Sequence, residues 1–197
     1  MDRPSAFDDN EELRELYVNL QEIYKRLSNK FITELDRLPP LPDLFVDRWQ
    51  RAALLGFGKG TNIYDSSLVL GQVKIGSECW IGPNTILDGS GHLVIGDCCT
   101  ISAGVHIYTH DNVKQTLSGK AMPIEREPVT IGSNVYVGPQ AIITKGTTIG
   151  NNVVIGAFSL INKDVPDNSI VMGQPGKVTG SVLIDDEGKI NFKYSAK

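Results

Sequence analysis

Aliphatic residues recur every six positions through most of the chain. Fourteen hexads share this frame, and their aliphatic positions are Ile63, Val69, Ile75, Ile81, Leu87, Ile95, Ile101, Ile107, Ile131, Val137, Ile143, Ile149, Ile155 and Ile161. Glycine follows many of them, and a small or β-branched residue usually stands four places later. A period of six fits neither an α-helix nor simple strand alternation. It predicts a parallel β-helix, in which each short strand ends in a turn and stacked coils bury one continuous core.

The hexad frame is interrupted twice. Two extra residues within 88–92 predict one lengthened turn. After Ile107 the frame returns only at Ile131, eighteen residues later than the period requires, and His110 lies at the start of this gap. Long insertions in a compact repeat are usually functional. We therefore expect the β-helix over residues 57–180, with a functional loop at 109–130.

The two ends of the chain have other patterns. Residues 9–35 carry apolar side chains at the spacing of an amphipathic helix, and a second helix is expected from about Pro42 to Leu55, with Gly56 as its stop. We expect this helical extension, residues 1–56, to cap the first coil or to fold against a neighbouring subunit. Residues 181–197 predict a C-terminal hairpin that turns around Asp186-Glu187-Gly188.

Charge and composition narrow the class of protein. The 197 residues carry a formal net charge of −4 without a long basic run, which argues against a nucleic-acid partner. No apolar segment reaches the length of a membrane span, and the N-terminus is acidic, unlike a signal peptide, so a cytoplasmic location is expected. Cys79 and Cys99 occupy inward hexad positions and are interpreted as buried thiols, not as a disulfide framework or a zinc site.

Three features together resemble one family: the hexads, Tyr108-Thr109-His110 before the loop, and the run from Ile155 to Pro166 with its Lys163-Asp164-Val165-Pro166 ending. They are similar to the hexapeptide-repeat acyltransferases, in the branch of galactoside and maltose O-acetyltransferases and the acetyltransferases of surface-polysaccharide synthesis. The likeness covers about residues 64–178 and leaves out residues 1–56. It implies an all-β left-handed parallel β-helix, a homotrimer, and acetyl-CoA bound between two subunits.

The resemblance also implies a catalytic base. An alcohol is a weak nucleophile at neutral pH, and a histidine with an unperturbed pKa near 6.5 is suited to take its proton. His110 matches the family's catalytic histidine and is the predicted base. The oxyanion donor is less direct, because Pro139 stands where relatives often carry a serine. We expect the Gly138 amide to replace that donor.

Binding residues follow from the same likeness. Asp88 matches an aspartate that hydrogen-bonds acceptor hydroxyls, although a turn-capping role is an equal alternative. His106 is expected to point outward beside the base and line the cleft, or simply to be solvated. Ile81 replaces an acceptor-side asparagine, so the identity of the acceptor does not carry over.

Four further residues are expected to hold coenzyme A. Tyr136 aligns with an aromatic residue beside the pantetheine arm, and Ala157 with a small residue whose backbone meets the pantetheine amides. Lys163 and Lys177 are expected to meet the phosphates, with plain solvation as the alternative.

The sequence thus predicts an acetyl-CoA-dependent O-acetyltransferase that acts on a sugar or polysaccharide precursor. An N-acetyltransferase of nucleotide-linked amino sugars would use the same base and stays open. A γ-carbonic-anhydrase-like zinc lyase needs three histidines, but the spacing of His106 and His110 is one residue short of that family's pair, with His92 close upstream. No metal is therefore expected. A non-catalytic β-helix scaffold would leave the His110 loop without a purpose.

Overall fold

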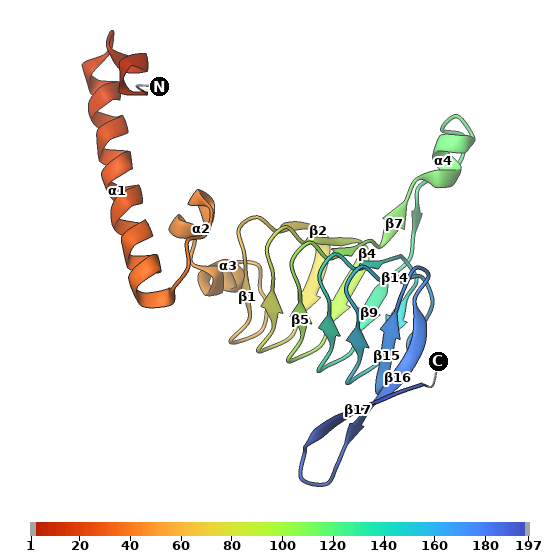
Figure 1. Ribbon diagram of the computed structural model, residues 1–197. Helices are drawn as coiled ribbons and strands as arrows, with labels where there is room; N and C mark the ends of the chain where they lie inside the picture. Colours follow the sequence, from red (N-terminus) through yellow and green to blue (C-terminus); the bar gives the residue numbers. More distant parts are fainter. Residues whose placement is uncertain (1–2, 196–197) are drawn as a thin grey trace. The chain divides into compact units, whose positions relative to one another are not determined.

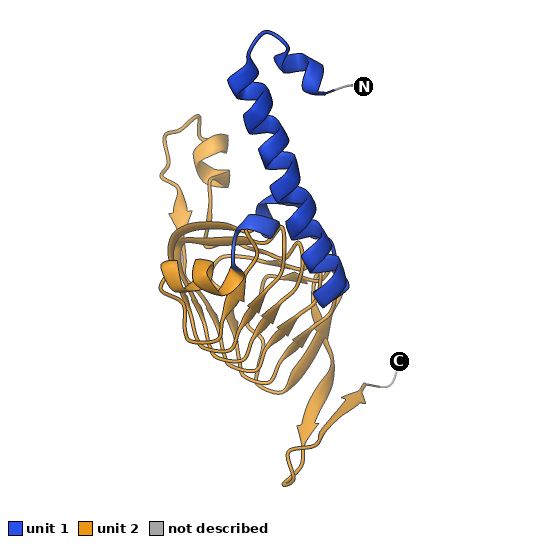
Figure 2. Cartoon of the chain, turned by 90° about the vertical axis from the view of Figure 1, so that its left-hand side faces the viewer, with its two compact units in different colours: residues 1–47 blue, residues 48–197 orange. Residues whose placement is uncertain are grey.

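The computed structural model describes residues 3–195. It divides the chain into two compact units, residues 1–47 and residues 48–197, which Figure 2 colours separately. The first unit holds the N-terminal helices, and the second holds the β-helix with its loop and its C-terminal strands.

The first unit is built on one long helix. Its elements are the short 3-10 helix η1 (Pro4–Phe7), α1 (Glu11–Leu35) and α2 (Leu41–Phe45). The Asn10 side chain caps α1 by accepting a hydrogen bond from the Leu13 N–H at 3.1 Å, which satisfies one of the free donors of the first turn. Asp36 adopts a left-handed conformation (φ 49°) and ends the helix. The predicted amphipathic helix is confirmed.

The second predicted helix is wrong as a single element. It is divided into α2 and α3 (Arg48–Leu54), because Val46 takes extended backbone angles after α2. Only α3 belongs to the unit of the β-helix, where it packs against the first strand, and Ala52 joins the common core. Arg51 fixes this position by donating hydrogen bonds to the backbone oxygens of Tyr64 and Ser67. The segment 48–54 therefore closes the open end of the core.

The β-helix has three faces, each formed by parallel strands from successive coils (Figure 1). The first face contains β1 (Asn62–Ile63), β3 (Trp80–Ile81), β5 (Thr100–Ile101), β10 (Tyr136–Val137), β13 (Val154–Ile155) and β15 (Ser169–Met172). The second face contains the first halves of β2 (Leu68–Ile75) and β4 (Ile86–Ile95), then β6 (His106–Ile107), β11 (Ile142–Ile143) and β14 (Leu160–Ile161). The third face contains the second halves of β2 and β4, then β9 (Val129–Ile131) and β12 (Thr148–Ile149).

The aliphatic hexad positions form the core, as predicted. Aligned residues such as Ile81, Ile101 and Val137 stack from coil to coil and are completely buried. Burial of one such side chain contributes about 1.5–3 kcal/mol. The glycine that follows the aliphatic position permits close stacking, because a Cβ at Gly138 would lie 2.6 Å from the Ala157 nitrogen.

The two-residue insertion differs from the expectation. Instead of lengthening a turn, residues 88–92 lie within the continuous strand β4, which follows β2 around the corner between the second and third faces. The extra residues are absorbed by a shift of register opposite Gly71 and Val73. Such a bulge redirects side chains locally, and Asp88 lies at its edge.

The gap after Ile107 forms a projecting hairpin-like loop (Figure 1). Its two arms are β7 (His110–Asp111) and β8 (Glu125–Arg126), which pair antiparallel, and α4 (Val113–Leu117) lies between them. At its base the Glu127 N–H donates to the Thr109 oxygen at 3.0 Å.

The last coil continues into antiparallel strands. β16 (Lys177–Ile184) pairs with β15 and with β17 (Ile190–Tyr194), so the expected C-terminal hairpin is present. Asp185 stabilises its turn by accepting hydrogen bonds from the Glu187 and Lys189 N–H groups.

Candidate active site

The loop leaves the β-helix at one corner, which we call the loop corner. It consists of the segments that directly follow the second-face positions, and in four stacked coils these segments begin at Asp88, Tyr108, Thr144 and Asn162. A cavity of about 390 Å³ opens there. It is lined by Tyr108, His110, Asp111, Asn112, Thr144 and Lys145.

His110 and Asp88 form a close pair at this corner. The His110 Nδ1 atom lies 2.6 Å from Asp88 Oδ2. The Asp88 carboxylate is completely buried, and it also accepts hydrogen bonds from the N–H groups of Ser90 at 3.0 Å and Thr109 at 2.8 Å. Burial alone would raise the pKa of the Asp88 carboxyl, but the hydrogen bonds from Ser90, Thr109 and His110 outweigh it and hold that pKa well below its usual range.

This pairing sets the tautomer of the imidazole. An ionised carboxylate can only accept hydrogen bonds, so His110 donates from Nδ1, and the neutral form of the ring carries its lone pair on Nε2. The His110 side chain is 34% exposed and borders the cavity, so a proton donor can approach it. The ring is therefore oriented and polarised as a general base requires.

Of the two roles expected for Asp88, the structure supports the turn-capping one, because the carboxylate accepts a hydrogen bond from the Ser90 N–H two residues on. The resemblance predicted that its carboxylate binds acceptor hydroxyls, but a completely buried group with its acceptors already engaged is not accessible to a substrate. Its partner is the predicted base itself, which lies 22 positions away along the chain.

His106 lies on β6, beside the site and half-buried. Its Nδ1 is 3.2 Å from the Tyr108 hydroxyl, and the two rings meet edge to face. Tyr108 also lines the cavity with His110. Sequence reasoning treated Tyr108 only as part of a motif, because nothing in the hexad pattern shows where its hydroxyl points.

The predicted oxyanion donor is wrong. The Gly138 N–H donates to the Ile155 oxygen at 2.8 Å, within the ladder that joins successive coils. A backbone donor used in this way cannot also stabilise a developing oxyanion.

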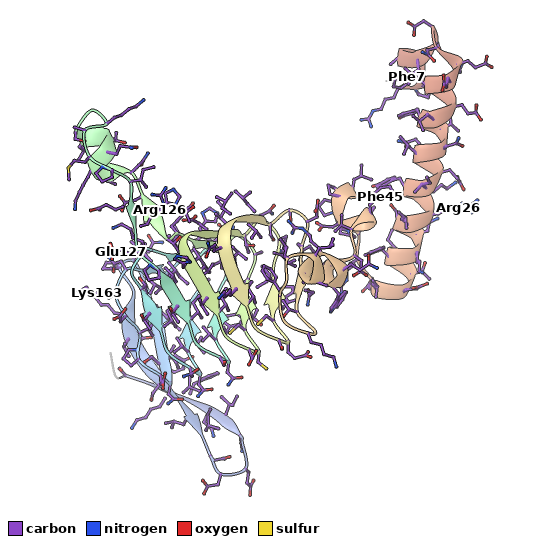
Figure 3. The ribbon with its side chains drawn as sticks, turned by 180° about the vertical axis from the view of Figure 1, so that it is seen from behind. Phe7, Arg26, Phe45, Arg126, Glu127 and Lys163 are labelled. Atoms are coloured by element: carbon purple, nitrogen blue, oxygen red, sulfur yellow. The ribbon has the colours of Figure 1, made fainter. Side chains whose placement is uncertain are left out.

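The four predicted coenzyme A residues are divided between different parts of the β-helix. Tyr136 is exposed on the first face, and Ala157 is exposed in the turn between the first and second faces. Lys163 lies at the loop corner, where Figure 3 shows it near Arg126 and Glu127. Lys177 is the exposed first residue of β16. Within residues 3–195, neither lysine forms an ion pair.

Tyr136 has additional neighbours that the sequence did not reveal. A groove of about 190 Å³ separates it from the C-terminal hairpin, and Val154, Val182 and Phe192 contribute to its apolar lining. The hairpin was predicted, but its partner surface depends on how β16 crosses the last coil.

The base of the loop carries a charged cluster. The Lys145 ammonium contacts Glu127 at 2.7 Å, and Glu125 and Asp111 at 3.4 Å each. The sequence pattern gave no reason to single out Lys145, because it stands in an ordinary turn of the β-helix.

Two features bear on alternative functions. Among residues 3–195, no group of three or more His, Cys, Asp and Glu side chains is arranged to hold a metal ion. In the same part of the chain, none of the helices has both the length and the apolar character that crossing a membrane requires.

The fold and site have clear relatives. Residues 128–163 match the bacterial transferase hexapeptide repeat, and residues 72–109 match the hexapeptide repeat of succinyl-transferase. Nodulation protein L of Rhizobium meliloti (strain 1021) is 40% identical over 109 residues, which are 55% of this chain and 60% of that protein. For three such relatives, the chain covers 60–66% of their own length.

Solved structures agree with this assignment. A maltose O-acetyltransferase from Clostridium difficile 630 is 27% identical with a TM-score of 0.59, over 87% of this chain and 89% of that one. A variant of AntD, an N-acyltransferase from Bacillus cereus in complex with dTDP and coenzyme A, is 26% identical with a TM-score of 0.58, over 64% of this chain and 72% of that one. The chain therefore contains two segments that match hexapeptide-repeat transferase models, and the predicted left-handed parallel β-helix is confirmed.

Proposed function

We propose that this protein transfers the acetyl group of acetyl-CoA to a hydroxyl of a sugar or a polysaccharide precursor, with His110 as the general base. The observation that carries the proposal is the His110–Asp88 pair, in which Nδ1 is engaged by the carboxylate while the histidine borders an open cavity on a fold shared with an acetyltransferase. A positioned base of this kind is worth about 10²–10⁴-fold in rate.

The proposed reaction needs only one proton carrier. Nε2 of His110 takes the hydroxyl proton while the acceptor oxygen attacks the thioester carbonyl, and a tetrahedral oxyanion forms. The imidazolium is stabilised by the buried Asp88 carboxylate. When the intermediate collapses, the C–S bond breaks, and the leaving thiolate of coenzyme A takes the proton back from Nε2.

We infer that the acetyl-CoA site lies between two copies of the chain in a homotrimer. His110 lies at the loop corner, whereas Tyr136 and Ala157 lie beyond the second face, so one chain does not bring them together. The second face itself exposes the aliphatic side chains of Leu68 and Ile142, which supports its burial in an assembly. Lys163 and Lys177 would then meet the phosphates of coenzyme A.

A second candidate is N-acetylation of a nucleotide-linked amino sugar. The similarity to AntD favours it, because that N-acyltransferase binds dTDP and coenzyme A. The same base and the same cavity would serve either acceptor, and only the nucleophilic atom differs.

One assay decides between these candidates. The purified full chain is given acetyl-CoA and a panel of sugars, nucleotide sugars and nucleotide-linked amino sugars, and release of free thiol is followed with product mass. We expect turnover on a hydroxyl acceptor and its near-complete loss in His110→Ala. Turnover only on amino sugars would replace the O-acetyl proposal with the alternative, and more than about a tenth of the rate in His110→Ala would refute the role of His110.

A further inference from the structure

Lys145 connects the rigid β-helix to the loop that carries His110. It stands in the turn after β11, and its side chain is only 17% exposed. Its ammonium contacts three carboxylates: Glu127 at 2.7 Å, Glu125 at 3.4 Å and Asp111 at 3.4 Å. These contacts raise the pKa of Lys145 above its usual value, chiefly through Glu127, so the lysine is charged throughout the neutral range.

The three carboxylates come from both arms of the loop. Asp111 belongs to β7 and directly follows His110, Glu125 belongs to β8, and Glu127 lies where the chain re-enters the β-helix. The strands β7 and β8 pair over just two register pairs, His110–Arg126 and Asp111–Glu125, beside the Glu127–Thr109 hydrogen bond at the loop base and the Lys114–Glu125 ion pair. A ladder this short is marginal in water without other support.

We propose that Lys145 is a positioning residue for His110: by binding both arms of the loop, it holds the strand β7 and thereby the direction of the imidazole. This inference rests on the proposed function, because it takes His110 to be the base. No other cation in residues 3–195 contacts carboxylates on both arms of the loop.

Charge explains why a lysine is required. Without the ammonium, Asp111, Glu125 and Glu127 would face one another as like charges at the loop base, and their repulsion would separate the arms. Lys114 contacts Glu125 alone, and it lies on α4 within the loop, so it cannot attach the loop to the β-helix.

The test uses Lys145→Met, which keeps the apolar stem without the charge, and Lys145→Arg, which keeps the charge and the reach. Lys74→Met is the matched control, because Lys74 is an exposed lysine on β2. We expect kcat to fall roughly 10–100-fold in Lys145→Met, since small misplacement of a catalytic group has effects of this size. KM for acetyl-CoA should change less than about twofold, and Lys145→Arg should recover most of kcat, because neither variant touches the proposed cofactor residues.

A second readout does not depend on activity. Amide hydrogen exchange over residues 108–127 should be faster in Lys145→Met and close to wild type in Lys145→Arg and Lys74→Met. Unchanged kcat in Lys145→Met, or a loss that Lys145→Arg does not restore, would overturn the proposal. If the wild-type protein transferred no acetyl group at all, unchanged exchange in Lys145→Met would still refute the attachment, and faster exchange would support it apart from the reaction.

Discussion

Asp88 directly follows a completely buried hexad position, and its side chain turns inward beneath the loop instead of outward to solvent. Besides His110, the carboxylate accepts hydrogen bonds from the Ser90 N–H, the Thr109 N–H and the Thr109 hydroxyl. Leaving these buried donors unsatisfied would be costly, so the carboxylate is fixed whether or not a substrate is present. Because the carboxylate accepts from Nδ1, it selects the tautomer with a basic Nε2. One buried residue therefore gives the neighbouring histidine its chemical role.

Replacement of Asp88 by Asn tests this relation. The amide has nearly the same shape but no charge, so it can neither stabilise the imidazolium nor specify the tautomer. We expect kcat to fall by roughly 10²–10⁴-fold, as for the orienting aspartate of other histidine-based sites. Steady-state kinetics on the identified acceptor measure it, and circular dichroism verifies the fold. A wild-type kcat in Asp88→Asn would show that the Asp88 charge has no role in the reaction.

The same variant has a defined pH dependence. The folded pKa of Asp88 lies below its unfolded value near 3.9, so its contribution to stability is present above about pH 4 and is lost as pH falls through the folded pKa. The difference in Tm between wild type and Asp88→Asn should therefore be constant from pH 7 to about pH 5 and decrease in stronger acid. A Tm difference between the two proteins that increased as the pH fell would contradict the expected direction.

At the scale of elements, the loop and strand β4 form one local structure. The Gly91 N–H donates to the Thr109 hydroxyl at 2.7 Å, directly where the loop begins. A Cβ at this position would lie 2.5 Å from the Thr109 oxygen and 3.0 Å from the Glu127 nitrogen, which are hydrogen-bonded to each other. The bulge in β4 therefore packs directly against the backbone at the base of the loop, and only a glycine at position 91 permits this contact.

Gly91→Ala tests this close approach. The new methyl group would press on two backbone atoms that cannot rotate away, and we expect a loss of about 1–3 kcal/mol in the free energy of unfolding, together with reduced turnover. Gly156→Ala is the control, because its Cβ would meet mainly the flexible Met172 side chain at 2.9 Å. Denaturant unfolding compares the two variants, and equal stability of both would show that the loop base tolerates the methyl group.

At the scale of the whole molecule, Tyr136 and Ala157, which are proposed to hold the pantetheine arm, lie on other sides of the β-helix than His110. A rigid stack of coils cannot bring its own corners together, since its core is continuous from α3 to the last coil. The assembly proposed above would bring the loop corner of one copy near the Ala157 turn of the next.

Subunit mixing tests this arrangement. His110→Ala and Ala157→Arg should each be inactive alone, the second because a large side chain fills the pantetheine path. In randomly mixed trimers, a shared site would be intact at about one quarter of the interfaces, so about a quarter of the wild-type activity should return. Light scattering confirms the trimer, and absence of any recovery in mixed trimers would place the whole site within one chain.

The amino-acid sequence by itself determined the repeat, the core and the place of the insertion. The inward position of each hexad is a local property. Its aliphatic side chain faces the core at the end of each short strand, and glycine or a left-handed residue at fixed offsets turns the chain. For the same reason α1 and the C-terminal hairpin were predictable from their own segments.

Only the tertiary structure decided what the functional side chains contact. The partner of Asp88 depends on a loop path that returns 22 residues later, and the Gly138 N–H belongs to a ladder with the next coil, so neither could be read from local periodicity. Lys145 likewise meets its three carboxylates only because the insertion folds back over its turn. A six-residue period determines which residues face inward. It carries no information about the path of the inserted loop, and that path decides which side chains of the loop and of the coils meet.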